Sequence, residues 1–398
     1  MLLGIGPDGP IAGRRVAITG IGVLASCGIG TDAFWEGLHG QPPEGERRVF
    51  DFDPDRWLSS KDARTLDRFA QFSVAVAAMA LEDAGELEAD PGRSGVIMGT
   101  GVGGLQSLET QILVYAEKGA KRISPRLVPM MMSNAGAAAV SMRLGWHGPS
   151  ETIITACAAG AHSITHAARL VASGRCDVAI GGAAEAGMTN VGIASFANMT
   201  ALSTSGHSRP FDIRRDGFVM TEGAGALVFE DWDRAVARGA HIYGELAGGA
   251  STADAHHITA PAPGGAGAAA CMQLAMDDAG IGPDQVRHIN AHGTSTPLND
   301  KAESDAIGKV FGADAPPVTS TKGVTGHGLG ASGAIEAVAA VLTIAHASIP
   351  PTFGYEEPDP EIHLDIVAGT ARPWEPGPIL SNSFGFGGHN GCLVISPA

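Results

Sequence analysis

The feature that most limits how this chain can fold is one arrangement that occurs twice along it. In each case a short apolar strand leads into a tight turn of small residues, and an alanine-rich helix follows. The first case has a strand at residues 152–155, a turn at Cys157 and a helix near residues 160–173. The second has a strand at residues 317–320, a glycine-rich turn and a helix near residues 332–346. We therefore predict an α/β fold made of two related halves.

The two halves are expected to meet near residues 232–250. Residues 14–240 would then form the first half and residues 241–398 the second. Residues 1–13 precede the first strand signal and are expected to form a loose extension. An alanine-rich periodic segment at residues 67–84 predicts a helix in the first half.

Composition narrows the class of protein. The chain has 398 residues, enough for a sizeable buried core, and 44% of them are hydrophobic. Its net charge of −16 disfavours nucleic-acid binding, which normally needs a basic excess. The five cysteines are scattered and form no C-x-x-C pair, which favours a reducing cytoplasm over a disulfide framework or a zinc site. The N-terminus lacks a signal-peptide pattern, and no apolar run of about 20 residues is available to span a membrane.

Two glycine patterns resemble a dinucleotide site. Residues 20–25 fit G-x-G-x-x-A and residues 99–104 fit G-x-G-x-x-G. Neither is followed, about 20 residues on, by an acidic residue on a second strand that would bind the ribose. We interpret both as tight strand-to-helix turns. The adjacent His256 and His257 would point apart in most backbones, so we interpret them as loop residues and not as metal ligands.

Cys157 is the first candidate for catalysis. It lies in T-A-C-A-A-G between a strand and a helix, where the free N–H groups and the dipole of the helix N-terminus favour thiolate over thiol. The same donors could hold the oxyanion of a thioester under attack. Judged by position alone, a buried structural cysteine is an equal alternative.

Two histidines occupy comparable positions at strand ends. His292 lies in N-A-H-G-T-S-T-P after a strand at residues 286–290, and His327 lies in T-K-G-V-T-G-H-G-L-G-A-S-G. Each alone could be a structural histidine, but active sites assemble where such loops converge. Lys322 precedes His327 on the same loop, and Glu336 on the following helix could neutralise it. A Lys–Glu pair beside two neutral imidazoles would orient them and set their pKa values.

A glycine loop near the C-terminus, S-N-S-F-G-F-G-G-H-N, contains two phenylalanines. Phe386 has a glycine on each side, which would let it move as a gate. The alternative is a tight β-turn with two packed aromatic side chains.

Taken in order, these four motifs resemble the signature elements of β-ketoacyl-(acyl carrier protein) synthases, and most of all the type II bacterial elongation group. Residues 208–226 also resemble this family, and the resemblance runs from about residue 14 to the C-terminus. It implies a thiolase-like fold, a five-layer αβαβα stack of two related halves that normally forms a homodimer. It also implies acyl carrier protein as partner and no metal or organic cofactor, because imidazole N–H groups suffice as donors.

The resemblance further implies roles for single residues. Cys157 would take the acyl group as a thioester, and His292 and His327 would promote decarboxylation of malonyl-carrier protein. The resulting carbanion would attack the acyl group and give a 3-oxoacyl product two carbons longer. Lys322 would support the histidines. Backbone N–H groups of Cys157 and Phe386 would hold the oxyanion, with Phe386 as the gate.

The resemblance also covers further positions. Thr259, Thr294 and Thr296 match family positions that line the pantetheine channel, and Lys61 and Arg64 match part of the family's basic surface for docking the carrier protein. The chain departs from the family at four places, which are Thr65 in the docking surface, Ala158 and Ala159 after the cysteine, and Gly323 after the lysine.

Several other functions stay open at this stage. A polyketide ketosynthase would share the chemistry, whereas a chain-length-setting subunit would lack the nucleophile at Cys157. A degradative thiolase would need a second cysteine in a C-x-G context, and the sequence after Cys392 does not provide one. A binding or scaffold protein is the alternative without catalysis. The acyl-chain length would depend on the pocket floor, which we expect near residues 105–115 and 193–202.

Overall fold

The computed structural model describes residues 1–6 and 9–398. At the N-terminus, strands β1 (Leu2–Gly6) and β2 (Gly9–Ala12) pair antiparallel in a small sheet of their own. The prediction of a loose extension at residues 1–13 was therefore wrong, because most of this segment is paired strand.

The first half contains a mixed sheet with the strand order β3-β8-β7-β5-β6. Its central strands β7 and β5 are parallel, β6 is parallel to β5, and β8 runs antiparallel to both β3 and β7. The strands are β3 (Val16–Ala25), β8 (Gly223–Asp231), β7 (Val178–Glu185), β5 (Ser94–Gly99) and β6 (Ser150–Glu151), and β4 (Gly28–Ile29) pairs with the end of β3.

The second half repeats this sheet strand for strand, with the order β9-β15-β14-β10-β11. Again the fourth strand is parallel to its two neighbours, and the second is antiparallel to the first and third. The strands are β9 (Gly244–Ala253), β15 (His389–Ser396), β14 (Ile379–Gly385), β10 (His288–Asn290) and β11 (Val318–Thr319). The prediction of two related halves is confirmed, and a short β3–β9 pairing joins their sheets.

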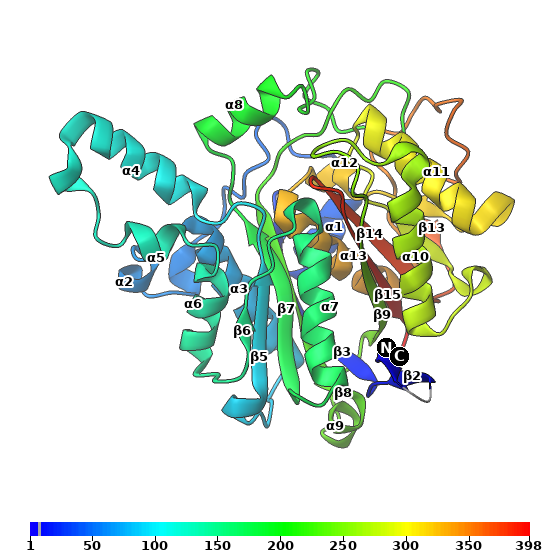
Figure 1. Ribbon diagram of the computed structural model, residues 1–398, viewed down its shortest axis with the longest axis horizontal. Helices are drawn as coiled ribbons and strands as arrows, with labels where there is room; N and C mark the ends of the chain where they lie inside the picture. Colours follow the sequence, from blue (N-terminus) through cyan, green and yellow to red (C-terminus); the bar gives the residue numbers. More distant parts are fainter. Residues whose placement is uncertain (7–8) are drawn as a thin grey trace.

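Helices form three further layers around these sheets (Figure 1). Helices α3 (Arg68–Ala84) and α6 (Ala135–Leu144) pack on the outer face of the first sheet. Helices α10 (Ala266–Ala279) and α11 (Pro297–Phe311) pack on the outer face of the second. Helices α7 (Ala159–Ala172) and α13 (Ser332–His346) lie between the sheets and share one hydrophobic cluster with strands of both. The order of layers is αβαβα, as the family resemblance implied.

The middle layer depends on small side chains. A Cβ placed on Gly160 would lie 2.5 Å from the backbone nitrogen of Ala334, so α7 and α13 cross at a point that only glycine fits.

The segment Leu329–His346 is long and apolar enough to cross a membrane by composition. Nearly all of it is buried inside the protein, and its apolar character is explained by its place in the central layer.

Helix α3 illustrates how local signals set an element. The side chain of Asp67 accepts a hydrogen bond from the backbone N–H of Phe69 and caps the first turn. Gly85 ends the helix at φ 75°, a conformation that glycine adopts without strain. The predicted helix at residues 67–84 is therefore confirmed.

Two local predictions were wrong. Gly20 and Gly22 do not form a turn but lie inside strand β3. There they let the backbone of α3 approach the sheet. Residues 152–155 are not a strand, since the ladder beside β5 ends at Glu151. The chain leaves the sheet edge there and bends toward Cys157.

The remaining elements lie outside the two main sheets and the helices named above. Helix α4 projects away from the body of the molecule (Figure 1). The helices are α1 (Thr31–Leu38), α2 (Ser60–Ala63), α4 (Leu105–Lys118), α5 (Leu127–Met131), α8 (Asn190–Asn198), α9 (Trp232–Ala237) and α12 (Lys322–Thr325), and the strands are β12 (Ser348–Ile349) and β13 (Arg372–Pro373).

Candidate active site

Cys157 lies in a short 3-10 turn, Ala156–Ala158, that leads directly into α7. Ala156 adopts φ 50°, an uncommon value for a residue with a side chain, and the turn is thereby sharp. The backbone N–H groups of Phe386 and of Cys157 itself are directed at the sulfur. A Cβ on Gly385 would lie 2.9 Å from the backbone nitrogen of Cys157, so the phenylalanine loop can approach Cys157 only at a glycine.

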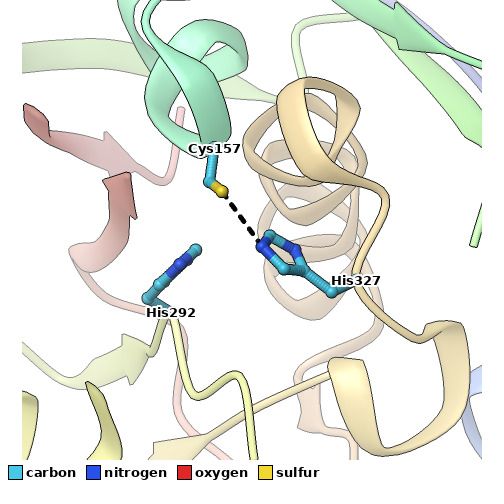
Figure 2. A group of neighbouring side chains, drawn as sticks. All are labelled: Cys157, His292 and His327. Atoms are coloured by element: carbon cyan, nitrogen blue, oxygen red, sulfur yellow. Dashed lines mark hydrogen bonds between the residues drawn. The ribbon is translucent and has the colours of Figure 1, made fainter. Parts of the chain in front are cut away.

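His327 faces this sulfur from the loop after α12. Its Nε2 lies 3.1 Å from Cys157 Sγ, and Figure 2 shows the two side chains pointing at each other. Its Nδ1 lies 2.9 Å from Ser332 Oγ at the start of α13. The edge of the Phe218 ring packs against the imidazole with ring centroids 5.1 Å apart. The imidazole is thus fixed on three sides and presents one nitrogen to the thiol.

His292 enters the same space from the end of β10. Its ring centroid lies 5.3 Å from that of His327, and both rings face Cys157 (Figure 2). The backbone N–H groups of His292 and Gly293 each donate to the buried carboxylate of Glu303, both at 2.8 Å. On the ring, Nδ1 lies 3.3 Å from Lys322 Nζ. The three side chains that the sequence singled out therefore meet in one place.

Lys322 and Glu336 form a buried ion pair beside His292, with exposed fractions of 1% and 2% for the two side chains. Burial raises the pKa of Glu336 to about 7, and the Lys322 ammonium limits this rise. Because an ammonium group only donates hydrogen bonds, Lys322 donates to Nδ1 of His292. The predicted neutralisation of Lys322 by Glu336 agrees with the geometry.

Burial also sets the protonation of the reacting groups. The pKa values of His292 and His327 lie well below the usual range, because burial and the nearby Lys322 charge disfavour imidazolium. Both are therefore neutral at pH 7, as expected from the sequence. Burial raises the pKa of the Cys157 thiol to about 12, against smaller opposing effects of Lys322 and the backbone N–H of Phe386. Burial therefore opposes the thiolate form that the donors of the helix end were expected to favour.

A cavity of about 540 Å³ opens onto these groups. Its wall includes all three threonines predicted for the pantetheine channel, and Thr294 and Thr296 share a hydrogen bond of 2.9 Å between their hydroxyl groups. The wall also contains large apolar side chains, and among them are Val102, Phe196, Met199, Phe218, Leu329 and Phe386. Of the two segments expected to shape the floor, residues 193–202 contribute to the cavity of this chain and residues 105–115 do not.

Phe386 is half-buried at the cavity wall, and its ring centroid lies 6.4 Å from that of Phe196. Gly387 and Gly388 follow it at φ 86° and 73°. Lys61 and Arg64 lie elsewhere, exposed on and just after α2. Neither lines the main cavity, which agrees with a surface position.

Three buried residues that hold the site were not identified from the sequence. Glu303 fixes the His292 loop, and its burial raises its pKa to about 7. Glu185 accepts from the backbone N–H groups of Gly101 and Gly330 and so ties the first half to the loop after His327. Ser332 contacts His327 directly. For Glu303, the only signal in the sequence is that an acidic residue lies on the helix that follows the His292 loop.

Comparison with known proteins agrees with this geometry. Residues 41–235 match the family model for the β-ketoacyl synthase N-terminal domain, and residues 243–356 match that for the C-terminal domain. The chain belongs to the β-ketoacyl synthase family. It is therefore a condensing enzyme, an acyltransferase that forms carbon–carbon bonds.

Individual relatives of this β-ketoacyl synthase cover almost its whole length. The 3-oxoacyl-[acyl-carrier-protein] synthase 2 of Synechocystis sp. is 45% identical over 408 residues, covering 96% of this chain and 98% of the relative. Among solved structures, the ishigamide ketosynthase/chain length factor has a TM-score of 0.92 at 34% identity, covering 97% of this chain and 100% of that one. A type II polyketide ketosynthase, solved in complex with its acyl-carrier protein, has a TM-score of 0.89 at 32% identity with the same coverage.

Proposed function

We propose that this synthase is a 3-oxoacyl-(acyl carrier protein) synthase that elongates a fatty acyl chain by two carbons. It joins an acyl group held on Cys157 to the two-carbon unit of malonyl-acyl carrier protein, with loss of CO2. One observation carries the assignment of residues. Cys157 Sγ lies 3.1 Å from a neutral His327, with His292 beside them, on the wall of a cavity large enough for an acyl chain.

In the first step, His327 accepts the thiol proton at Nε2 while Cys157 Sγ attacks the acyl thioester. Because burial raises the thiol pKa to about 12, proton transfer and attack are expected to be coupled. The oxyanion receives hydrogen bonds from the backbone N–H groups of Cys157 and Phe386, which already point at the sulfur. The carrier-protein thiolate then leaves and takes the proton from His327, which becomes neutral again.

In the second step, the malonyl carboxylate leaves as CO2, and its electron pair moves into an enolate of the thioester. Two N–H groups, on Nε2 of His292 and of His327, stabilise the enolate oxygen. Lys322 donates to Nδ1 of His292, so the hydrogen of that imidazole stays on Nε2. The enolate carbon attacks the acyl-cysteine, a C–C bond forms, and Cys157 leaves as a thiolate that one solvent proton neutralises.

Substrate access follows from the cavity wall. Thr259, Thr294 and Thr296 line the route by which a pantetheine arm would reach Cys157. Phe386 sits on the wall beside two glycines with positive φ and would act as the gate. The substrates are carried by acyl carrier protein, which would dock on the exposed cations Lys61 and Arg64 through charge attraction.

The assembly and location of the enzyme are part of the proposal. Residues 14–240 and 241–398 would be its two halves, and two copies would form a homodimer. Support for the dimer comes from α4, where Ile112, Leu113 and Tyr115 each leave more than half of their surface exposed. The five unpaired cysteines support a cytoplasmic location.

A polyketide ketosynthase is the second candidate, because a ketosynthase of a type II polyketide assembly shares this fold at a TM-score of 0.89. The chain is 45% identical to a 3-oxoacyl synthase and 32% identical to that polyketide ketosynthase, which favours fatty-acid elongation. A non-catalytic chain-length subunit is disfavoured by the complete set of Cys157, His292 and His327.

The test is a full condensation assay with acyl- and malonyl-acyl carrier protein, read by mass spectrometry of the product. A single addition of two carbons is expected with wild type and with Lys61→Arg, and no product with Cys157→Ala. Repeated additions without reduction would support the polyketide alternative. If no product forms with any primer from about 2 to about 16 carbons, both functions are contradicted.

A further inference from the structure

The two catalytic histidines differ in what holds their second ring nitrogen. At His292, Nδ1 faces the ammonium group of Lys322 at 3.3 Å. At His327, Nδ1 faces the hydroxyl of Ser332 at 2.9 Å. This difference has chemical consequences, since an ammonium group is only a donor whereas a hydroxyl group can donate or accept.

Ser332 is well placed to act on His327. The residue is only 3% exposed and begins α13, whose next turns are entirely buried. The backbone N–H of Gly328 donates to the same Oγ at 2.9 Å, which fixes the hydroxyl oxygen beside the imidazole. That oxygen has a second lone pair and one hydrogen, so it can either accept from Nδ1–H or donate to bare Nδ1.

We propose that Ser332 is a positioning residue that lets His327 act as a base in one step and as a hydrogen-bond donor in the other. The inference rests on the proposed function. In acyl transfer, His327 takes the Cys157 proton at Nε2 and becomes imidazolium, and its Nδ1–H donates to Ser332 Oγ. In decarboxylation, His327 stays neutral, the Ser332 hydroxyl donates to Nδ1, and Nε2 presents its hydrogen to the enolate oxygen.

His292 lacks this freedom. With Lys322 donating to its Nδ1, it keeps its hydrogen on Nε2 and serves as a donor only. The structure thus divides the labour between two residues of the same type. The histidine 3.1 Å from the thiol is the one whose partner can change role.

Removing the hydroxyl should affect the two steps unequally. A hydrogen bond to a charged group is worth a factor of about 10 to 150, and only acyl transfer places a charge on His327. Ser332→Ala is therefore expected to slow acylation of Cys157 by that factor. Decarboxylation, in which His327 stays neutral, should change by less than about fivefold, the value of a neutral hydrogen bond.

The experiment measures the two half-reactions separately in the full-length enzyme. Acylation is followed by intact mass after mixing with acyl-acyl carrier protein alone, and decarboxylation by loss of malonyl-carrier protein without primer. Ser332→Thr keeps the hydroxyl and should restore acylation. Thr343→Val is the control, because it removes another buried hydroxyl from α13, one that donates to Ala339 O far from His327.

A second measurement is made on wild type and does not depend on how Ser332→Ala folds. Nitrogen-15 spectra of histidine-labelled wild type, assigned with His327→Gln and His292→Gln, report which ring nitrogen carries hydrogen. We expect His292 to hold its hydrogen on Nε2 throughout, and His327 to populate both neutral forms. A single form of His327 that is unchanged between free enzyme and acyl-enzyme would overturn the inference.

Outcomes of the kinetic test are equally decisive. Equal loss of both half-reactions in Ser332→Ala, or loss of neither, overturns the role of Ser332 while leaving the proposed function intact. Failure of wild type itself to become acylated would instead be a failure of the proposed function.

Discussion

The buried pair of Lys322 and Glu336 gives a prediction whose size can be worked out from the structure. The two side chains are 1% and 2% exposed and in direct contact. For unit charges about 3 Å apart at an effective dielectric constant of about 20, the attraction is about 5 kcal/mol. Both charges lose most of their hydration, however, so the net value of the pair is much smaller than this.

Removing one partner leaves the other charge buried and unpaired. Lys322→Met and Glu336→Leu should therefore each lower the free energy of unfolding by about 3 to 5 kcal/mol. The double variant removes both charges and should lie within about 2 kcal/mol of wild type. Urea unfolding of the four proteins at pH 8, followed by fluorescence, measures these differences.

Activity should not recover with stability. Lys322 Nζ is the group that contacts Nδ1 of His292, so malonyl decarboxylation should be lost in Lys322→Met and in the double variant alike. If the double variant is destabilised by the sum of the two single effects, the two charges do not act as a pair, and the reasoning is refuted.

Three further predictions concern helix packing, the pH dependence of stability and the hydrogen bonds of the His292 loop. Gly160→Ala should destabilise the protein by about 1 to 3 kcal/mol, because its Cβ would meet the backbone of Ala334. Gly308→Ala, at a helix position with open space, should be neutral or stabilising in the same unfolding assay. Equal effects of the two substitutions would contradict the packing argument. His288 is fully buried, and burial lowers its pKa to about 3, so stability should be lost as pH falls below about 6.5, where only the unfolded chain takes up the proton. His288→Met should therefore lose about 2 kcal/mol less stability than wild type between pH 7 and pH 5, and parallel losses in the two proteins would count against this cause. Glu303→Ala should lower kcat for decarboxylation by about tenfold or more because the His292 loop loses two hydrogen bonds, and an unchanged kcat would rule out that role.

Much of the architecture could be predicted from local patterns. Helix α13 occupies residues 332–346 as expected, since its alanine-rich pattern follows directly on a glycine-rich turn. The repeated turn and helix correctly indicated two halves, because each helix needs a sheet on which to bury its apolar face, although residues 152–155 before the first turn are not a strand. The meeting of Cys157, His292 and His327 in one place could be predicted because loops converge where strands end, and both sheets bring those ends together.

Other features depend on contacts that no local pattern contains. Strand β3 continues through Gly20 and Gly22, since these glycines serve the close approach of α3 and not a turn. The raised pKa of Cys157 follows from burial by both halves, which the helix-end argument did not include. Glu303 contacts the backbone of His292, and Ser332 contacts the ring of His327. Because these contacts form only when the chain is folded, the roles of both residues could be seen only in the structure.

The claim that Cys157 is the nucleophile can be tested by one direct measurement. Purified enzyme is mixed with acyl-acyl carrier proteins of several chain lengths, and its intact mass is recorded beside that of Cys157→Ala. The account predicts that wild type gains one acyl mass, mapped to the peptide containing Cys157, and that the variant gains none. An unmodified wild type with every primer, or equal acylation of the variant, would contradict it.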